Sequence, residues 1–504
     1  MIARKSTLII ITHLLNGLLG YVGLKFIALY MEPWEFGVIG FAYGFVSLFA
    51  IFGQFGFDYA HIKRISEGKD FGVCIATFAA TKVALAGLMA TVVIGSVAIW
   101  KYVLGGGFET PFHESAIYIL LAYFFLLTLT QTMVSTFNAK KEIAKSQLPL
   151  LVFSLTRAIA TIFVAFYGLG VLALAYTYLF GEIFHFIFAL LFFRGYSLGK
   201  PSLDYFKDYA KFAMPMAIAV SSSIIMTNID KVFIQFFWSA TQVGEYFAIF
   251  NLSQFVILFV SAVGMLLFPT ISEFHAQNNM EAAKALVLKS ERYLSMIMFP
   301  IIIIMVVLAE PVIHILISDQ YMSALPVLQI LPFFVLFEAL SLPYTSRLQG
   351  MDMPKLVRNR VFIMMICNVS LNLILIPREI KSFGMELPGL GAQGAALATV
   401  IAFIIGLVYI RFVTWSITGI KGNIRIILHV IAAAVMGVIL IYLSKVIFID
   451  RWYELLTIAG CGFILYFTLL SIMKEFRNDD FVFFADVLNI KKMFEYVKEE
   501  VKGR

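Results

Sequence analysis

Charged residues and cysteines are both scarce in this sequence. Only 14% of its 504 residues are Asp, Glu, Lys or Arg, whereas soluble chains carry roughly 25%. This low charge excludes a cytosolic enzyme and a disordered protein. It also makes nucleic-acid binding a poor explanation of the net charge of +7. Cys74, Cys367 and Cys461 form no CxxC pair and no Cys/His ligand spacing, so we expect small buried hydrophobes rather than a disulfide framework or a metal site.

Hydrophobic residues are abundant instead. They make up 61% of the chain, and the mean hydropathy is +0.91. Fourteen apolar runs are long enough to span a bilayer. In lipid such runs must be helices, because every backbone polar group needs an internal partner. We therefore predict an all-α polytopic membrane protein. The expected spans are 7–30, 36–60, 72–99, 115–137, 148–168, 171–193, 213–236, 244–268, 293–309, 325–345, 357–376, 391–410, 425–447 and 453–473.

Lys and Arg gather in the loops on one side of these spans. With the N-terminus in the cytoplasm, the cytoplasmic segments hold 29 of the 38, the external segments hold five and the spans hold four. Membrane proteins carry such an excess in their cytoplasmic loops. We therefore expect a multi-pass protein of the cell membrane with both termini in the cytoplasm.

The predicted external loops are short. The longest, about 100–114 and 377–390, have about fifteen residues each. They leave no large external segment for the acids, bases or arginines of a glycan polymerase or ligase. The sequence also lacks a Walker P-loop, so we do not expect ATP to drive the protein directly. The prediction is a protein that is not an enzyme and holds no cofactor.

Two parts of the chain repeat one another. Residues 25–67 match residues 231–273 at an offset of 206 for the lysines and for Ser-Glu, and of 207 for the glycines. Gly-Leu-Gly also recurs, at 168–170 and 389–391. The repeat unit is six helices, an even number, so both copies have the same orientation. Parallel repeats of this kind favour a transporter whose two lobes rock about a central site.

The repeat predicts the domain organisation. An N-lobe covers residues 1–200, a C-lobe covers 201–415, and two extra spans follow in 416–475. In the linker 197–212, Leu203, Phe206, Tyr209 and Phe212 fall at helical spacing, which indicates a helix on the cytoplasmic membrane surface ahead of the C-lobe spans. The amphipathic pattern of residues 476–504 predicts a cytoplasmic or interfacial helix.

Four motifs follow one another in order along the chain. They are EPWEFG at 32–37, TNIDKVFI at 227–234 continuing through VGEY at 243–246 to LFPTISE at 267–273, RLQGM at 347–351, and Asn368, Asn372 and Pro377 followed by GAQGAALAT at 391–399. These motifs resemble those of polysaccharide-exporter and O-antigen-type flippases in the multidrug/oligosaccharidyl-lipid/polysaccharide (MOP) superfamily. The resemblance covers about residues 1–415, and beyond them only the number of spans matches.

The resemblance implies a fourteen-helix flippase. Such proteins move a polyprenyl-phosphate- or pyrophosphate-linked oligosaccharide from the cytoplasmic to the outer leaflet by alternating access, for surface polysaccharide or glycan assembly. The implied partners are this lipid-linked oligosaccharide, membrane lipids and glycan-assembly proteins. Some members couple transport to a proton or sodium ion. The alternatives are a cation-coupled multidrug or small-solute exporter of the same superfamily, a membrane glycan-assembly enzyme, and a scaffold that recruits glycosyltransferases through the tail.

Cations inside the spans are the candidates for binding the substrate phosphate, because an intramembrane charge needs a functional reason. They are Lys25, Lys231 and Arg157. Lys25 and Lys231 are repeat mates, and the alternative for both is that the ammonium snorkels to the headgroups. We expect Lys82, near the inner end of its span, to snorkel.

Three acids inside the spans are the candidates for binding a coupling proton or sodium ion. They are Asp230, Glu182 and Glu338. Adjacent helix residues do not face each other, so Asp230 either binds an ion or pairs with a cation other than Lys231. Glu182 lies at the same expected depth as Arg157 across a predicted hairpin, and a structural ion pair is the favoured interpretation.

Uncharged polar side chains inside the spans could contact the sugar or line the cavity. Hydrogen bonds between helices are the commoner use of such groups in membranes. The candidates are Asn16, Thr227, Asn251, Asn368 and Asn372.

Overall fold

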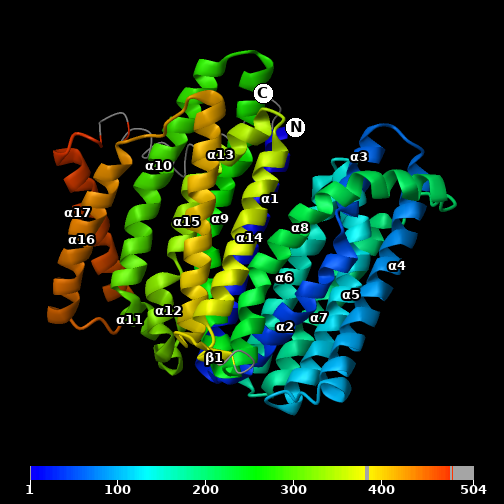
Figure 1. The fold of residues 1–504 in the computed structure, drawn as a ribbon, viewed down its shortest axis with the longest axis horizontal. Helices are drawn as coiled ribbons and strands as arrows, with labels where there is room; N and C mark the ends of the chain where they lie inside the picture. Colours follow the sequence, from blue (N-terminus) through cyan, green and yellow to red (C-terminus); the bar gives the residue numbers. More distant parts are fainter. Residues whose placement is uncertain (1, 381–384, 477–479, 481–504) are drawn as a thin grey trace. The chain divides into compact units, whose positions relative to one another are not determined.

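A computed structural model of the chain describes residues 2–380, 385–476 and 480 (Figure 1). Apart from a two-residue antiparallel pair, β1 (Glu379–Ile380) and β2 (Met385–Glu386), the regular structure in these residues is helical. Thirteen helical segments of the described chain are long and apolar enough to cross a membrane. The predicted all-α polytopic membrane fold is confirmed.

Each predicted span falls on one helix or on two consecutive helices. The eighth, 244–268, lies within a single 37-residue helix, α9. The helices are α1 (Ile2–Tyr30), α2 (Pro33–Gln54), α3 (Phe57–Ser66), α4 (Phe71–Ala98), α5 (Pro111–Ala139), α6 (Ile143–Phe166), α7 (Gly170–Phe193), α8 (Leu203–Phe237), α9 (Ala240–Ala276), α10 (Met280–Val307), α11 (Ala309–Val312), α12 (Leu325–Ile330), α13 (Phe333–Gly350), α14 (Pro354–Leu375), α15 (Gly391–Thr418), α16 (Ile426–Val446) and α17 (Trp452–Ile472). Short π-helical and 3-10 turns lie at Ile99–Val103, Ile313–Ile317 and Asp319–Ala324.

Local sequence explains where the helices that surround the site begin and end. Pro33 opens α2, where its fixed φ suits the first helical turn, and Glu32 and Glu35 form a capping box around it. Phe55 and Gly56 then take left-handed conformations, with φ of 40° and 73°, and separate α2 from α3. Gly168 and Gly170, at φ of 60° and 83°, make the turn between α6 and α7 that the repeat had marked.

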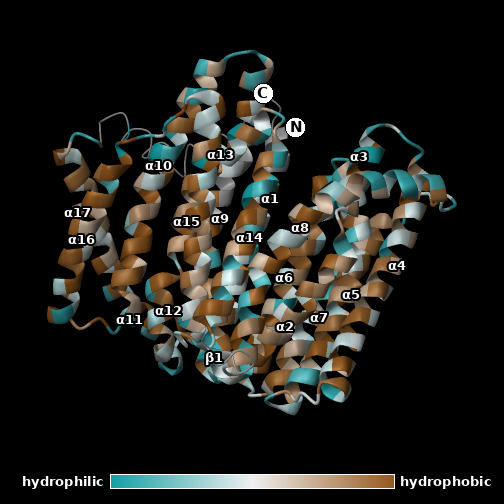
Figure 2. Ribbon diagram, in the orientation of Figure 1, coloured by the Kyte–Doolittle hydropathy of each residue, from teal (hydrophilic) through white to brown (hydrophobic). Residues whose placement is uncertain are grey.

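Backbone contacts divide the chain into two compact units. Unit 1 contains the residues up to Ile10, Leu252–Arg360 and the residues from Phe403 onward. Unit 2 contains Ile11–Asn251 and Val361–Ala402. In each unit, hydrophobic residues cover the helices, whereas hydrophilic residues gather mainly at their ends and in the loops (Figure 2). Unit 2 combines the helices of the predicted N-lobe with parts of α9, α14 and α15 and all of α8, so the division into two lobes stays a prediction.

Three expectations about single segments need correction. Residues 203–212 do not form a separate surface helix but are the first turns of α8, and Tyr209 is completely buried, bonded to His61 on α3 at 3.0 Å. Cys461 is exposed rather than buried. Lys82 does not snorkel: it is 1% exposed and its ammonium lies 2.6 Å from the Asp58 carboxylate. The predicted tail helix, 476–504, lies outside the described residues except for Phe476 and Asp480.

The two extra spans, α16 and α17, are tied to α10 within unit 1. Arg292 on α10 pairs with Glu475, just after α17, at 2.6 Å and with Asp480 at 2.7 Å. Arg425, just before α16, pairs with the other carboxylate oxygen of Glu475 at 3.1 Å. Glu475 is fully buried, so these pairs are part of the packing between the three helices.

Candidate functional site

Helix α8 carries both members of the Asp230–Lys231 pair into the interior of unit 2. Each side chain is 2% exposed. Since neighbouring residues on a helix point about 100° apart, Asp230 reaches α9, α14 and α15, while Lys231 reaches α2 and α9. The two charges therefore belong to two adjoining sites on one helix.

Asp230 is the centre of a polar cluster of four helices. Its carboxylate accepts hydrogen bonds from Tyr246 Oη on α9 at 2.5 Å, Asn372 Nδ2 on α14 at 2.5 Å and Thr399 Oγ1 on α15 at 2.9 Å. Asn368 lies one turn from Asn372 and bonds to both Asn372 and Thr399, at 3.1 and 3.2 Å. Asn368 and Asn372 are fully buried, so their side chains serve Asp230 in this conformation.

This cluster can hold a small cation. The five residues contribute six side-chain oxygens. Asn372 turns its amide nitrogen toward Asp230, and its Oδ1 atom is buried without a partner in the described chain. Asp230 has no ion-pair partner among the described residues. A buried carboxylate surrounded by oxygen donors suits a proton or a hard cation such as sodium.

Lys231 lies among aromatic rings instead of reaching the membrane surface. Its ammonium donates to Asn228 Oδ1 at 2.9 Å. It also lies 5.2, 5.3 and 5.8 Å from the ring centroids of Phe247, Phe250 and Tyr43. Snorkelling is therefore wrong for Lys231, and its charge is stabilised by cation–π contact and one amide.

Tyrosine rings connect Lys231 on α8 to Arg157 on α6. Tyr43 on α2 lies 5.7 Å from Tyr178 on α7, and the Arg157 guanidinium stacks over Tyr178 at 3.7 Å. The ring centroid of Tyr123 on α5 lies 6.4 Å from that of Tyr43 and 5.7 Å from that of Tyr178. We call Lys231, Tyr43, Tyr178, Tyr123 and Arg157 the cation–tyrosine cluster. The Arg157 Nε atom is buried without a hydrogen-bond partner in the part of the chain that the structure describes.

Glu182 does not pair with Arg157, contrary to the favoured expectation. Its carboxylate accepts from Thr130 Oγ1 at 2.6 Å and contacts His185 Nδ1 at 3.1 Å. Glu182 is fully buried and His185 is 3% exposed. The expected depth of Glu182 and Arg157 in the membrane came from counting residues back from the turn between their helices. Such a count does not reveal that a histidine one turn along the same helix satisfies the carboxylate.

The other candidates are members of neither cluster. The Thr227 hydroxyl and the Asn251 amide bond to carbonyls of their own helices, at 3.0 and 2.7 Å. Asn16 accepts from Ser154 on α6. Glu338, in unit 1, pairs with Arg360 at 2.6 Å. Lys25 is half-buried on α1, and its predicted role stays a prediction.

The tyrosines are the part of the site that sequence reasoning missed. Tyr123, Tyr178 and Tyr246 are buried and Tyr43 is half-buried, yet 22 tyrosines and 51 phenylalanines are spread along the sequence. Tyr178 lies four residues before Glu182, and this helical spacing from a charged candidate was the one signal available.

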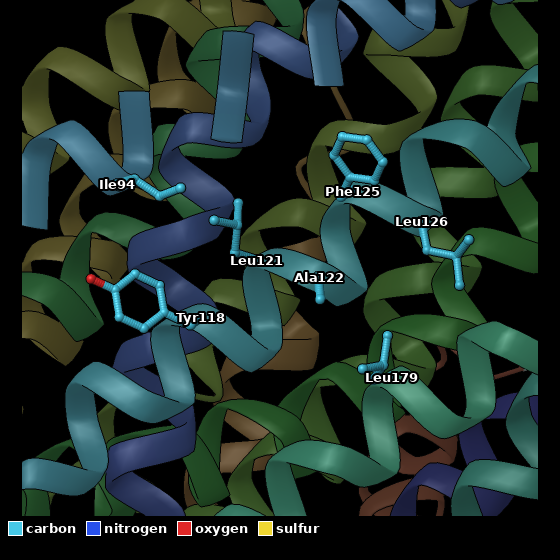
Figure 3. Close-up of a pocket in the computed structure, with 7 residues that line it drawn as sticks. All are labelled: Ile94, Tyr118, Leu121, Ala122, Phe125, Leu126 and Leu179. Atoms are coloured by element: carbon cyan, nitrogen blue, oxygen red, sulfur yellow. The ribbon is translucent and has the colours of Figure 1, made fainter. Parts of the chain in front are cut away.

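An apolar groove of about 560 Å³ lies elsewhere in unit 2. Figure 3 shows its lining from α4, α5 and α7, which is Ile94, Tyr118, Leu121, Ala122, Phe125, Leu126 and Leu179. None of the candidate site residues lines this groove, so it is separate from both clusters.

Comparison with known proteins identifies the family. Residues 27–326 match the family described as polysaccharide biosynthesis protein. The chain belongs to this family. A probable low-salt glycan biosynthesis flippase, Agl15 of Haloferax volcanii, is 22% identical over 481 residues, which are 95% of this chain and 98% of that protein. An uncharacterised membrane protein of Methanocaldococcus jannaschii, MJ1068, is 26% identical over 40% of this chain and 37% of its own.

Solved structures show the same fold. The lipid II flippase MurJ in an inward closed conformation superposes with a TM-score of 0.75, covering 92% of this chain and 98% of its own at 18% identity. An inward-facing multidrug resistance MATE transporter superposes with a TM-score of 0.63, covering 81% of this chain and 96% of its own at 16% identity. This member of the polysaccharide biosynthesis family is therefore a multi-pass membrane protein with the fold of the MurJ flippase and of the MATE transporter.

Proposed function

We propose that the chain is a flippase that moves a polyprenyl-phosphate- or pyrophosphate-linked oligosaccharide from the cytoplasmic to the outer leaflet by alternating access. The observation that carries the proposal is the cation–tyrosine cluster. It places two cations and three tyrosines from five helices in the interior of a membrane transporter. The name of the Haloferax volcanii relative, a probable glycan biosynthesis flippase, supports the same substrate class.

The chemistry of this cluster suits a phosphate next to a sugar. A guanidinium offers a planar set of donors that matches phosphate oxygens, and a lysine adds a point charge. Arg157 stacks on a ring and has an unpartnered donor in the described chain, so it can turn toward an incoming anion without breaking an ion pair. Tyrosine rings present apolar faces and hydroxyls to the neighbouring sugar.

The Asp230 cluster supplies a place for a coupling ion. A proton or sodium ion bound there neutralises the carboxylate, and this changes the hydrogen bonds that link α8 to α9, α14 and α15. Lys231 is the next residue on α8, so a shift of α8 reaches the phosphate-binding side of the same helix. We therefore assign Asp230 to ion coupling and Lys231 and Arg157 to the phosphate. Glu182 and Glu338 keep their predicted roles as secondary candidates.

The test is complementation of cells that lack this chain. Surface glycan is labelled and lipid-linked oligosaccharide is extracted, with wild type, Lys231→Ala or Arg157→Ala supplied in trans. Lys207→Ala is the matched control, because Lys207 is 77% exposed and lies on α8 outside both clusters. Each cluster variant should lower surface glycan by about tenfold or more, the worth of one charge-assisted hydrogen bond, and precursor should accumulate on the inner leaflet.

Three results would decide against parts of this proposal. Full rescue by both cluster variants would be compatible with the flippase but would reject Lys231 and Arg157 as its phosphate site. Unchanged glycan with a rise in drug sensitivity would replace the flippase by a multidrug exporter. Transport by Asp230→Asn that still follows an imposed sodium or proton gradient would remove the coupling role of Asp230.

A further inference from the structure

Two glycines that the sequence repeat makes equivalent, Gly37 and Gly244, lie against each other in unit 2. A Cβ added to Gly37 on α2 would stand 1.7 Å from the carbonyl oxygen of Ala240 and 2.9 Å from the amide nitrogen of Gly244. A Cβ added to Gly244 on α9 would stand 1.8 Å from the carbonyl oxygen of Pro33. The backbones of α2 and α9 are therefore in direct contact, and glycine alone fits at either position.

The contact continues along one face of α2. A Cβ on Gly40 would meet the Phe247 ring of α9 at 2.9 Å, and one on Gly44 would meet the Asn228 carbonyl and the Lys231 side chain of α8 at 3.2 Å. Small residues let helices approach closely in membranes, where dispersion contacts rather than hydrophobic burial hold them together. Since α2 belongs to the predicted N-lobe and α8 and α9 to the predicted C-lobe, this glycine face joins the two lobes.

A loop of the predicted N-lobe fastens the same place by a second contact. Glu109, in the connection between α4 and α5, accepts hydrogen bonds from Gln235 Nε2 and from the backbone nitrogen of Ala240, both at 2.7 Å. Ala240 is the first residue of α9 and also supplies the carbonyl that touches Gly37. A carboxylate at a helix N-terminus satisfies a free backbone donor and complements the helix dipole.

We propose that the Gly37–Gly244 crossing, latched by Glu109, is the external gate of the transporter. It closes the external end of the contact between the lobes in this conformation and separates when the lobes rock. The inference rests on the alternating access of the proposed function and on the predicted cytoplasmic N-terminus, which puts the start of α2 outside. Gly44, two turns further along α2, packs on Lys231, so opening the gate also frees the environment of that cation.

The gate makes a directional prediction. Alanine at either glycine cannot fit unless α2 and α9 move apart, so it destabilises the closed gate. A state in which these helices are separated carries no such penalty, and its population must rise. Because overpacking disfavours the closed gate alone, we expect the ratio of open to closed molecules to rise by about tenfold or more.

The experiment measures the distance between the lobes without substrate. Spin labels are placed on Gly107→Cys and Glu379→Cys, two exposed positions on external loops of the predicted N- and C-lobes, after the three native cysteines are replaced. Double electron–electron resonance in lipid nanodiscs then gives the distance distribution. Gly37→Ala and Gly244→Ala should each move most of the distribution to a longer distance. Gly87→Ala on α4, where a Cβ would meet nothing within 4 Å, should leave it unchanged.

Two results overturn the gate. One is a folded Gly37→Ala or Gly244→Ala variant that keeps the wild-type distribution. The other is an equal shift in Gly87→Ala. Should both glycine variants fail to fold, Glu109→Ala decides, because it removes both hydrogen bonds of the latch by changing only an exposed loop side chain. It must raise the long-distance population, and no change refutes the gate. Suppose instead that the gate responds as expected but the wild-type chain does not restore surface glycan to cells that lack it. That result would count against the flippase alone.

Discussion

Lys82 and Lys231 are buried to the same extent but have different surroundings. Lys82 is 1% exposed and bonds to the Asp58 carboxylate at 2.6 Å and to the Gly53 carbonyl at 3.2 Å. Lys231 is 2% exposed and has rings and an amide around it. A buried charge with an opposite charge beside it is structurally satisfied, whereas one held by neutral groups can still take an anion. The counter-charge, more than the burial, separates the structural lysine from the candidate site.

Removing the two partners of the Lys82–Asp58 pair should have unequal effects. Asp58→Asn leaves a fully buried ammonium without its counter-charge and should lower the free energy of unfolding by about 3 kcal/mol. Lys82→Met leaves a carboxylate that is 25% exposed and still bonded to Ser135 at 2.9 Å, so it should cost about 1 kcal/mol. Chemical unfolding in detergent micelles measures both. Equal losses would show that the pair, rather than the buried lysine, sets the cost.

The sequence located the charged candidates but not their partners. Asp230, Glu182 and Arg157 were recognisable because charges are rare in apolar runs. Their neighbours, Tyr246 and Tyr178, were not, because aromatic residues are frequent everywhere in this chain. Partners come from other helices, as Asn372 and Thr399 do for Asp230. The relative rotation of two packed helices, which decides such contacts, is set by many side chains together and by no local pattern.

At the scale of elements, α8 shows how one helix can replace two expected ones. The sequence predicted a surface helix followed by a span, because Leu203, Phe206, Tyr209 and Phe212 share a face. The structure has one 35-residue helix, and part of that face packs on α3, where Phe206 stacks on Phe57 at 6.0 Å and Lys63 lies 4.4 Å from the Phe212 ring. Tyr209 is buried in this contact, whereas Leu203 stays 76% exposed. An amphipathic pattern predicts that one face is covered, but it does not distinguish lipid from protein as the cover.

The Arg292 contacts predict how α16 and α17 respond to one substitution. Arg292→Met leaves the buried Glu475 and Asp480 carboxylates without the guanidinium that pairs with both. The packing of α16 and α17 on α10 should loosen, so backbone hydrogen exchange in α16 and α17 should accelerate by about tenfold or more. Exchange in α5, α6 and α7 should not change.

Lys445→Met is the control for this measurement. Lys445 lies exposed in the last turn of α16, so its loss changes the charge of the same element without touching the buried carboxylates. Uniform acceleration along the whole chain in Arg292→Met would mean global destabilisation and would contradict a local clamp.

For the whole molecule, the sequence predicted the fold class well because it depends on composition. Apolar runs of spanning length have one solution in lipid, the helix, and thirteen such helices were found in the described residues. The parallel repeat reappears as a contact, since Gly37 and Gly244 meet. The compact units were not predictable, because helices such as α9 and α15 are shared between units, and a repeat in sequence does not fix where packed helices separate.

The orientation in the membrane is the last property that the sequence predicts, and it determines which end of the glycine contact faces outward. Cytoplasmic segments hold 29 of the 38 basic residues under the predicted topology, and external segments hold five. Moving a lysine or arginine across the membrane during insertion is costly, so the reverse orientation would require many such transfers. Reporter enzymes active only on one side of the membrane, fused after residue 504 and inserted after Gly107, should therefore report opposite sides, with the C-terminus in the cytoplasm. A cytoplasmic signal from the Gly107 insertion would show that the protein has the opposite orientation in the membrane. The Gly37–Gly244 crossing would then be an internal gate.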